Sequence, residues 1–127
     1  IVVDDTVPVV DVALKTAKFY RHESCGKCTP CRVGTNWTVK MLDLIERGEA
    51  TPMDLDIMSS IQEQIMGNCL CVLGDAMAMP VGSMIDKFRP EFEEHIERAR
   101  EQAGLGVSLP QVEPQEGGPY PAAGVAA

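Results

Sequence analysis

The sequence predicts an all-α fold, a small four- to five-helix bundle followed by a flexible C-terminal tail. Apolar residues recur every three or four positions through most of residues 9–103, and Pro and Gly stand where helices would begin and end. No stretch alternates between apolar and polar residues for long, which argues against strands. The 127 residues, 45% of them hydrophobic and 24% charged, suffice for one core and not for two ordinary domains.

Three segments differ in composition. Residues 1–8 begin Ile-Val-Val without an initiator Met, and we expect them to be the end of an upstream domain and a linker. Residues 9–103 carry the helical periodicity and form the predicted helical domain. Residues 104–127 are rich in Gly, Pro, Ala and Val, with Glu113 and Glu116 as their charged residues, which predicts a disordered tail.

The first predicted helix runs from Val9 to Tyr20, with Ala13 and Ala17 on the same face as both ends. Ahead of it we expect Asp4-Asp5-Thr6 to cap the helix before Pro8. The second helix is predicted to begin near Arg32 and to stop at Gly48. Its predicted inward face consists of Val33, Trp37, Met41, Leu44 and Ile45.

The third predicted helix has Thr51 as its cap, Pro52 at its first position and Gly67 at its end. Its apolar face consists of Leu55, Met58, Ile61 and Ile65. The fourth is predicted to start at Pro80, with an inward face of Val81, Met84, Ile85 and Phe88. The pair Arg89-Pro90 opens the fifth, whose inward residues are Phe92, Ile96 and Ala99.

Charge and hydropathy exclude two classes of function. The 11 Lys and Arg against 19 Asp and Glu give a net charge of -8, which argues against a general nucleic-acid binder and against a cationic membrane-surface module. No apolar run is long enough to span a bilayer, so we expect no direct membrane insertion. The expected partners are other proteins or a cationic or redox centre.

The five cysteines carry the strongest chemical signal. Cys25, Cys28 and Cys31 form a C-x2-C-x2-C pattern, and Cys71 follows much later. Such a triplet with a distant fourth thiolate is typical of [4Fe-4S] sites, in which four thiolates converge on four irons. A zinc site would more often use two separate C-x2-C pairs. Thiol-disulfide chemistry at Cys25-Gly26-Lys27-Cys28 is the other alternative, although a third nearby cysteine has no part in it.

Positive charge surrounds this motif. Residues 15–40 contain six basic side chains and Glu23 as the one acidic side chain, within a chain that is acidic as a whole. Lys27 and Arg32 lie in the predicted ligand loop, where they would stabilise the more negative, reduced form of a cluster and raise its potential. We expect Lys15, Lys18 and Lys40 to form a solvated helix face.

Two motifs resemble the signatures of a known family. Residues 23–32 have the sequence Glu-Ser-Cys-Gly-Lys-Cys-Thr-Pro-Cys-Arg, and residues 71–76 have Cys-Val-Leu-Gly-Asp-Ala, followed by Pro80-Val81. Both resemble the flavin- and NADH-binding subunit of NADH:quinone oxidoreductase, respiratory complex I, and the similarity extends from Val9 to Arg100. The resemblance implies that Cys25, Cys28, Cys31 and Cys71 hold one [4Fe-4S] cluster and that Cys69 is not needed as a ligand.

The resemblance also implies a function. The cluster would take single electrons from FMN, which is reduced by NADH and bound with it in the upstream part of the subunit, and would relay them to the next iron-sulfur cluster. The whole complex is then a translocase, and this fragment is an electron carrier without its own active site. Its partners would be the other iron-sulfur subunits of the peripheral arm, on the cytoplasmic side of a bacterial inner membrane or the matrix side of a mitochondrial one.

Alternatives and departures accompany that resemblance. The same module is found in the diaphorase subunits of NAD-linked hydrogenases and formate dehydrogenases, and a zinc-stabilised interaction module is an alternative of a different class. Val33 stands where the family usually has Glu, and Met79 stands where Trp is frequent. With Val33, a polar contact common in the family is absent, which bears on the tuning of the cluster potential.

Overall fold

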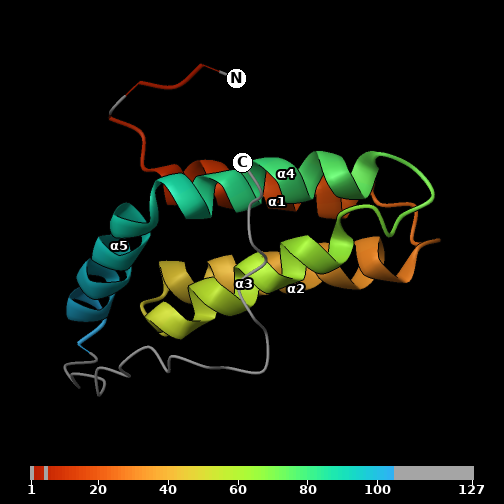
Figure 1. The fold of residues 1–127 in the computed structure, drawn as a ribbon. Coiled ribbons are helices and arrows are strands. Elements are labelled where there is room, and N and C mark those ends of the chain that lie inside the picture. Colours follow the sequence, from red (N-terminus) through yellow and green to blue (C-terminus); the bar gives the residue numbers. More distant parts are fainter. Residues whose placement is uncertain (1, 5, 105–127) are drawn as a thin grey trace, which may run out of the picture.

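The computed structural model describes residues 2–4 and 6–104, and this part of the chain folds into five helices. Their bounds are α1 Val9–Glu23, α2 Thr29–Glu46, α3 Pro52–Ile65, α4 Leu73–Lys87 and α5 Arg89–Gln102. In Figure 1, α1 and α4 lie side by side in one layer, α2 and α3 form the other, and α5 crosses one end of the bundle. The α1–α2 and α3–α4 loops lie together at the opposite end. The predicted all-α bundle is confirmed.

Two further predictions concern the C-terminal tail and membrane insertion. The predicted tail lies outside the described residues from position 105 onward. None of the helices in the described part of the chain is long and apolar enough to cross a membrane.

The inward face of α1 is confirmed, and its predicted cap is wrong. Ala13 and Ala17 are fully buried, while Val9 and Tyr20 pack against the core from its edge. The helix is preceded by Pro8 without a side-chain cap, and Asp5 lies outside the described residues. Instead, the backbone N–H of Val9 donates to Oε1 of Glu91 at 2.8 Å. A carboxylate from α5 therefore caps α1 and complements its dipole.

Helix α2 begins at Thr29, three residues before the predicted start, so that Cys31 and Arg32 belong to its first turn. Pro30 suits this turn because its missing N–H would have no partner there. The predicted inward face is also wrong at Trp37, which is 54% exposed. Small and polar residues are buried instead, because α3 lies very close: a Cβ on Gly34 would come within 2.5 Å of Ile65 Cδ1.

Helix α3 agrees with the prediction at both ends. The Thr51 N–H donates to Oδ2 of Asp54 at 2.6 Å, and the two residues form a capping box. Gly67, with a φ of +69°, follows the end of the helix. One inward residue is polar: Gln62 is buried and donates to the hydroxyl of Thr38 on α2 at 2.9 Å.

Helix α4 begins at Leu73, seven residues before the predicted start, and contains Pro80 in its interior. The early start buries Met77 and Ala78 in the core, and this burial offsets the cost of an interior proline. Phe88, predicted to face inward, is 45% exposed at the junction with α5. The predicted α5 is confirmed, with Phe92 and Ile96 buried.

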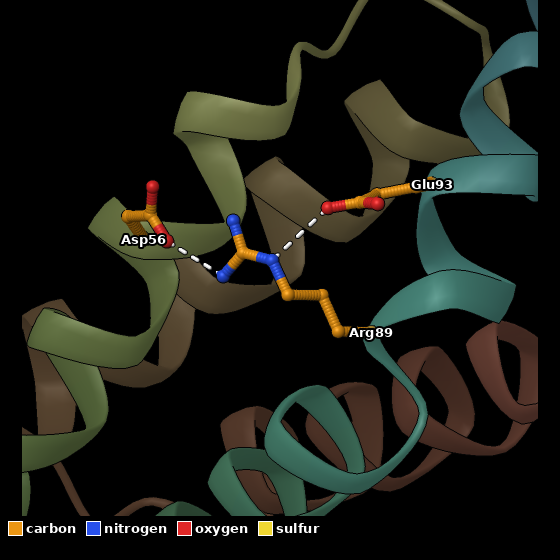
Figure 2. A network of polar contacts seen from close by, with 3 residues as sticks. All are labelled: Asp56, Arg89 and Glu93. Carbon is orange, nitrogen blue, oxygen red and sulfur yellow. Dashed lines mark hydrogen bonds and ion pairs between the residues drawn. The ribbon is translucent and has the colours of Figure 1, made fainter. Parts of the chain in front are cut away.

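Two further contacts join α5 to other parts of the bundle. Figure 2 shows Arg89 between Asp56 of α3 and Glu93 of its own helix, with Nη1 2.6 Å from Asp56 Oδ1 and Nε 3.0 Å from Glu93 Oε1. The hydrogen bond to Asp56 is the main cause that raises the pKa of Arg89. Near the other end of α5, a Cβ on Gly48 would come within 2.4 Å of the backbone nitrogen of Arg100. The α5 backbone thus rests directly on the turn after α2.

Candidate metal centre

All five cysteines line one cavity at the end of the bundle opposite α5. The cavity has a volume of about 150 Å³, and its wall consists of Glu23, Ser24, Cys25, Lys27, Cys28, Cys31, Cys69, Cys71 and Leu73. This is about five times the ~30 Å³ that a water molecule occupies in the liquid. The cysteines are all free thiols. Two loops that are distant in sequence therefore bring their sulfurs to one space.

The cysteines differ in exposure across this cavity. Cys31, in the first turn of α2, is 7% exposed. Cys28 and Cys69 are half-buried, whereas Cys25 and Cys71 are exposed. The cavity therefore has a protected side against the helices and an open side formed by the loops.

Hydrogen bonds hold the sulfurs of Cys28 and Cys31. The backbone N–H of Leu70 donates to Cys28 Sγ at 3.3 Å, and Ser24 Oγ lies 3.3 Å from Cys31 Sγ. Ser24 Oγ also accepts the N–H of Gly26 at 3.4 Å. Gly26 has a φ of +77°, a conformation that side chains with a Cβ rarely adopt, and this allows the loop to turn sharply between Cys25 and Cys28.

Cys69 is set apart from the other four thiols. Its sulfur donates to the carbonyl of Ile65 at 3.7 Å. Burial, followed by the nearby sulfurs of Cys31 and Cys28, raises the pKa of the Cys69 thiol. Gly74 makes room for this side chain, because a Cβ there would come within 2.6 Å of Cys69 Sγ. A raised pKa disfavours the thiolate, which is the form that binds metals.

The two cations predicted to tune the site occupy different places. Lys27 lines the cavity. The Arg32 side chain turns back along the loop, and its Nη1 donates to the carbonyl of Gly26 at 2.8 Å. The expectation that Arg32 is a loop residue is thus wrong: it is a helical residue that fastens the loop, and it does not line the cavity.

The donor set fits an iron-sulfur group. Within residues 2–4 and 6–104, no three His, Cys, Asp or Glu side chains are grouped to hold a single metal ion. A cubane places a separate thiolate on each of four irons, so its donors stand around a body larger than one ion. Cysteine sulfurs around the wall of one cavity, which also contains Glu23, match that chemistry.

Some features of the site lie beyond sequence reasoning. The Leu70 amide and the space at Gly74 were not predicted, because both depend on contacts between loops and helices that only the fold creates. In the sequence, the signal for the space beside Cys69 was Gly74, the glycine within the second cysteine motif.

Together, the helical bundle and its sulfur-lined cavity define a small module for binding a metal-sulfur centre. Residues 11–95 match the family described as the NADH-ubiquinone oxidoreductase-F iron-sulfur binding region. The chain belongs to this family, and the resemblance expected from its two motifs is confirmed.

Similar proteins are named as subunits of NADH oxidoreductases. The chain is 39% identical over 124 residues to the mitochondrial NADH-ubiquinone oxidoreductase 51 kDa subunit of Aspergillus niger, covering 97% of this chain and 24% of that protein. It is 48% identical over 93 residues to an NADH-quinone oxidoreductase subunit of Streptomyces coelicolor, covering 73% of this chain and 21% of that protein. The chain thus spans about a quarter of the length of these curated relatives.

A solved structure shares the fold. The structure of an NAD+-reducing [NiFe]-hydrogenase in the air-oxidized state matches with a TM-score of 0.69 and 35% sequence identity. The match covers 73% of this chain and 16% of that one.

Proposed function

We propose that this chain is the electron-transfer region of the flavin subunit of NADH:quinone oxidoreductase and that Cys25, Cys28, Cys31 and Cys71 hold one [4Fe-4S] cluster. The observation that carries the proposal is the meeting of these four cysteines, from two distant loops, at one cavity. Membership of the iron-sulfur binding family supports it.

The choice of Cys71 over Cys69 rests on their surroundings. Cys71 is exposed on the open side of the cavity. Cys69 is directed toward the Ile65 carbonyl, and burial favours its protonated form. Cys71 therefore offers its sulfur on the open side of the cavity, whereas the sulfur of Cys69 already donates to a backbone carbonyl.

The cluster, when bound, would supply one-electron transfer at this site. The chain contributes the four thiolates, the positive charge of Lys27 at the cavity wall and the protection of Cys31 from solvent. Electrons would come from FMN reduced by NADH, both bound in other parts of the subunit. They would leave to an iron-sulfur cluster of a neighbouring subunit in the peripheral arm, on the cytoplasmic or matrix side of the membrane.

The domain organisation follows from the same proposal. Residues 1–8 would connect the module to the flavin-binding part, residues 9–103 would form the cluster-binding unit, and residues 104–127 would be a tail. The positions of the five helices within residues 9–103 support the central boundary.

A second candidate is the same module in the diaphorase subunit of an NAD-linked hydrogenase. The match to the NAD+-reducing [NiFe]-hydrogenase favours it. Both candidates assign the same four ligands and differ in the host complex. Mass spectrometry of the subunits that co-purify with the full-length protein distinguishes them: a hydrogenase large subunit supports the second, and further complex I subunits support the first.

The test of the cluster is a set of cysteine variants. We expect the wild-type protein to bind four irons and four sulfides and to absorb in the visible range. Cys28→Ala and Cys71→Ala should lose the cluster, and the matched control Cys69→Ala should keep most of it. Stoichiometric zinc in a colourless protein would overturn the cluster assignment. Equal loss of iron in Cys69→Ala and Cys71→Ala would overturn the ligand choice.

A further inference from the structure

The side chain of Ser24 lies against the most protected of the cavity sulfurs. We infer that the Ser24 hydroxyl donates a hydrogen bond to the sulfur of Cys31 and thereby raises the reduction potential of the bound centre. This inference rests on the proposed function, because it requires Cys31 to be a ligand. It assigns Ser24 a positioning role that acts through the sulfur.

The geometry sets the direction of this hydrogen bond. Ser24 Oγ lies 3.3 Å from Cys31 Sγ and accepts the N–H of Gly26 at 3.4 Å. A hydroxyl has one proton to donate and two lone pairs to accept with. Since Gly26 occupies a lone pair, the proton is available for the sulfur, and a ligating thiolate has no proton of its own. Ser24 is therefore the donor and Cys31 the acceptor.

The surroundings strengthen the bond. Cys31 is 7% exposed and Ser24 is half-buried, so little water competes for either atom. Among the described residues, Cys28 and Cys31 are the proposed ligands whose sulfurs have hydrogen-bond partners. The partner of Cys28 is a backbone amide, so Ser24 is the side chain through which this effect can be altered by substitution.

The sign of the effect follows from charge. Hydrogen bonds to charged acceptors are stronger than those to neutral ones, and they strengthen as the acceptor becomes more negative. One added electron makes the ligand sulfurs more negative, so the Ser24 bond stabilises the reduced form more than the oxidised form. Removing the hydroxyl should lower the potential. The added charge is shared by four irons and their sulfurs. The change in potential caused by a hydrogen bond to one sulfur therefore reflects only a fraction of the free energy of that bond.

The decisive comparison is Ser24→Thr against Ser24→Val in the full cluster-containing subunit, since these side chains have the same shape and differ in the hydroxyl. Ser24→Ala gives the simple deletion, and Ser59→Ala, on α3 away from the cavity, is the matched control. Each variant is titrated with dithionite in the presence of mediators, the reduced centre is followed by EPR, and iron is counted.

At the wild-type midpoint, we expect Ser24→Val and Ser24→Ala to show a roughly threefold lower ratio of reduced to oxidised centres. This corresponds to about 28 mV at 59 mV per tenfold change for one electron. Ser24→Thr and Ser59→Ala should stay at the wild-type midpoint with full iron content.

Three outcomes would overturn the inference. The first is a fully loaded Ser24→Val protein with an unchanged or raised midpoint, and the second is a Ser24→Thr protein shifted as far as Ser24→Val. The third is loss of iron in Ser24→Ala and Ser24→Val but not in Ser24→Thr, which would make the hydroxyl a structural support of the loop. A wild-type protein without iron would instead overturn the proposed function and, with it, the role of Ser24.

Discussion

The backbone N–H of Leu70 donates a hydrogen bond to the sulfur of Cys28 at 3.3 Å, although 42 positions separate the two residues. This contact joins the α3–α4 loop to the α1–α2 loop across the cavity. A hydrogen bond of the protein itself thus fixes the two loops that supply the proposed ligands relative to each other. Ligand bonds to a cluster would add further links between the same two segments.

Removing the cluster should loosen this end of the bundle more than the α5 end. Ligand bonds that connect Cys31 to Cys71 close a long loop, and a cross-link of that span lowers the entropy of the unfolded chain by an amount worth roughly 2–4 kcal/mol. We expect chelation under mild oxidation to lower the thermal midpoint and to speed hydrogen exchange in residues 24–31 and 66–76. The Cys71→Ala protein, treated identically, serves as the control and should not change. An unaltered midpoint in the treated wild-type protein would contradict the prediction.

Lys27 should influence the reduction potential more than Arg32. Lys27 lines the cavity, whereas the guanidinium of Arg32 is bound to the Gly26 carbonyl. We expect Lys27→Gln to lower the midpoint by roughly 20–40 mV, because a nearby positive charge stabilises the reduced form even after screening by solvent and salt. Arg32→Gln removes the same charge and should shift the midpoint less. A larger shift in Arg32→Gln, measured by EPR-monitored titration, would reverse this assignment.

Gly48 and Gly67 form a matched pair for measuring the α5 contact. Both have a φ of +69°, so substitution by Ala costs each about 1–2 kcal/mol of backbone strain. A Cβ at Gly48 would additionally collide with the backbone of Ala99 and Arg100, whereas one at Gly67 would meet nothing within 4 Å. We expect Gly48→Ala to lower the free energy of unfolding by at least ~2 kcal/mol more than Gly67→Ala does in urea denaturation. Equal decreases in the free energy of unfolding would mean that α5 shifts at little cost to accommodate a Cβ at Gly48.

The ion pair of Arg89 and Asp56 should contribute little in spite of its short distance. The side chain of Asp56 is 64% exposed and that of Arg89 is 37% exposed, so water and salt screen the pair. A double-mutant cycle with Arg89→Gln and Asp56→Asn should give a coupling energy of about 0.5–1 kcal/mol at low salt, and less at about 1 M salt. Parallel cycles at both salt concentrations check this, and a coupling that does not depend on salt would show that packing dominates.

How far the sequence predicted the fold depended on whether the signals were local. The ends of α3 were predicted because Thr51, Pro52 and Gly67 act within a few residues of the helix. The inward face of α2 was predicted only in part: Ile45 is buried and Trp37 is exposed, while Gly34 and Thr38 are buried where α3 approaches closely. The predicted start of α4 was wrong because a proline inside a helix has the same local sequence as one at a beginning, and burial of Met77 outweighs its cost.

The candidate site likewise has features that the sequence predicts and features that depend on the fold. The spacing of Cys25, Cys28 and Cys31 lies in the sequence itself, and the family motif adds Cys71. The assignment of these four cysteines as the ligands stays a prediction. The environment of each sulfur, by contrast, arises from tertiary contacts such as the Leu70 amide, which no local pattern contains.

The bond from Val9 to Glu91 has a consequence for engineering. The carboxylate that accepts the Val9 N–H at the start of α1 comes from α5, so this cap is supplied from within the helical unit. The segment from Pro8 to the end of α5 therefore contains the carboxylate that caps its first helix. Grafting that unit onto a different electron donor, through a linker joined ahead of Pro8, should leave α1 intact, so the choice of donor can be varied separately from the integrity of the metal-binding scaffold.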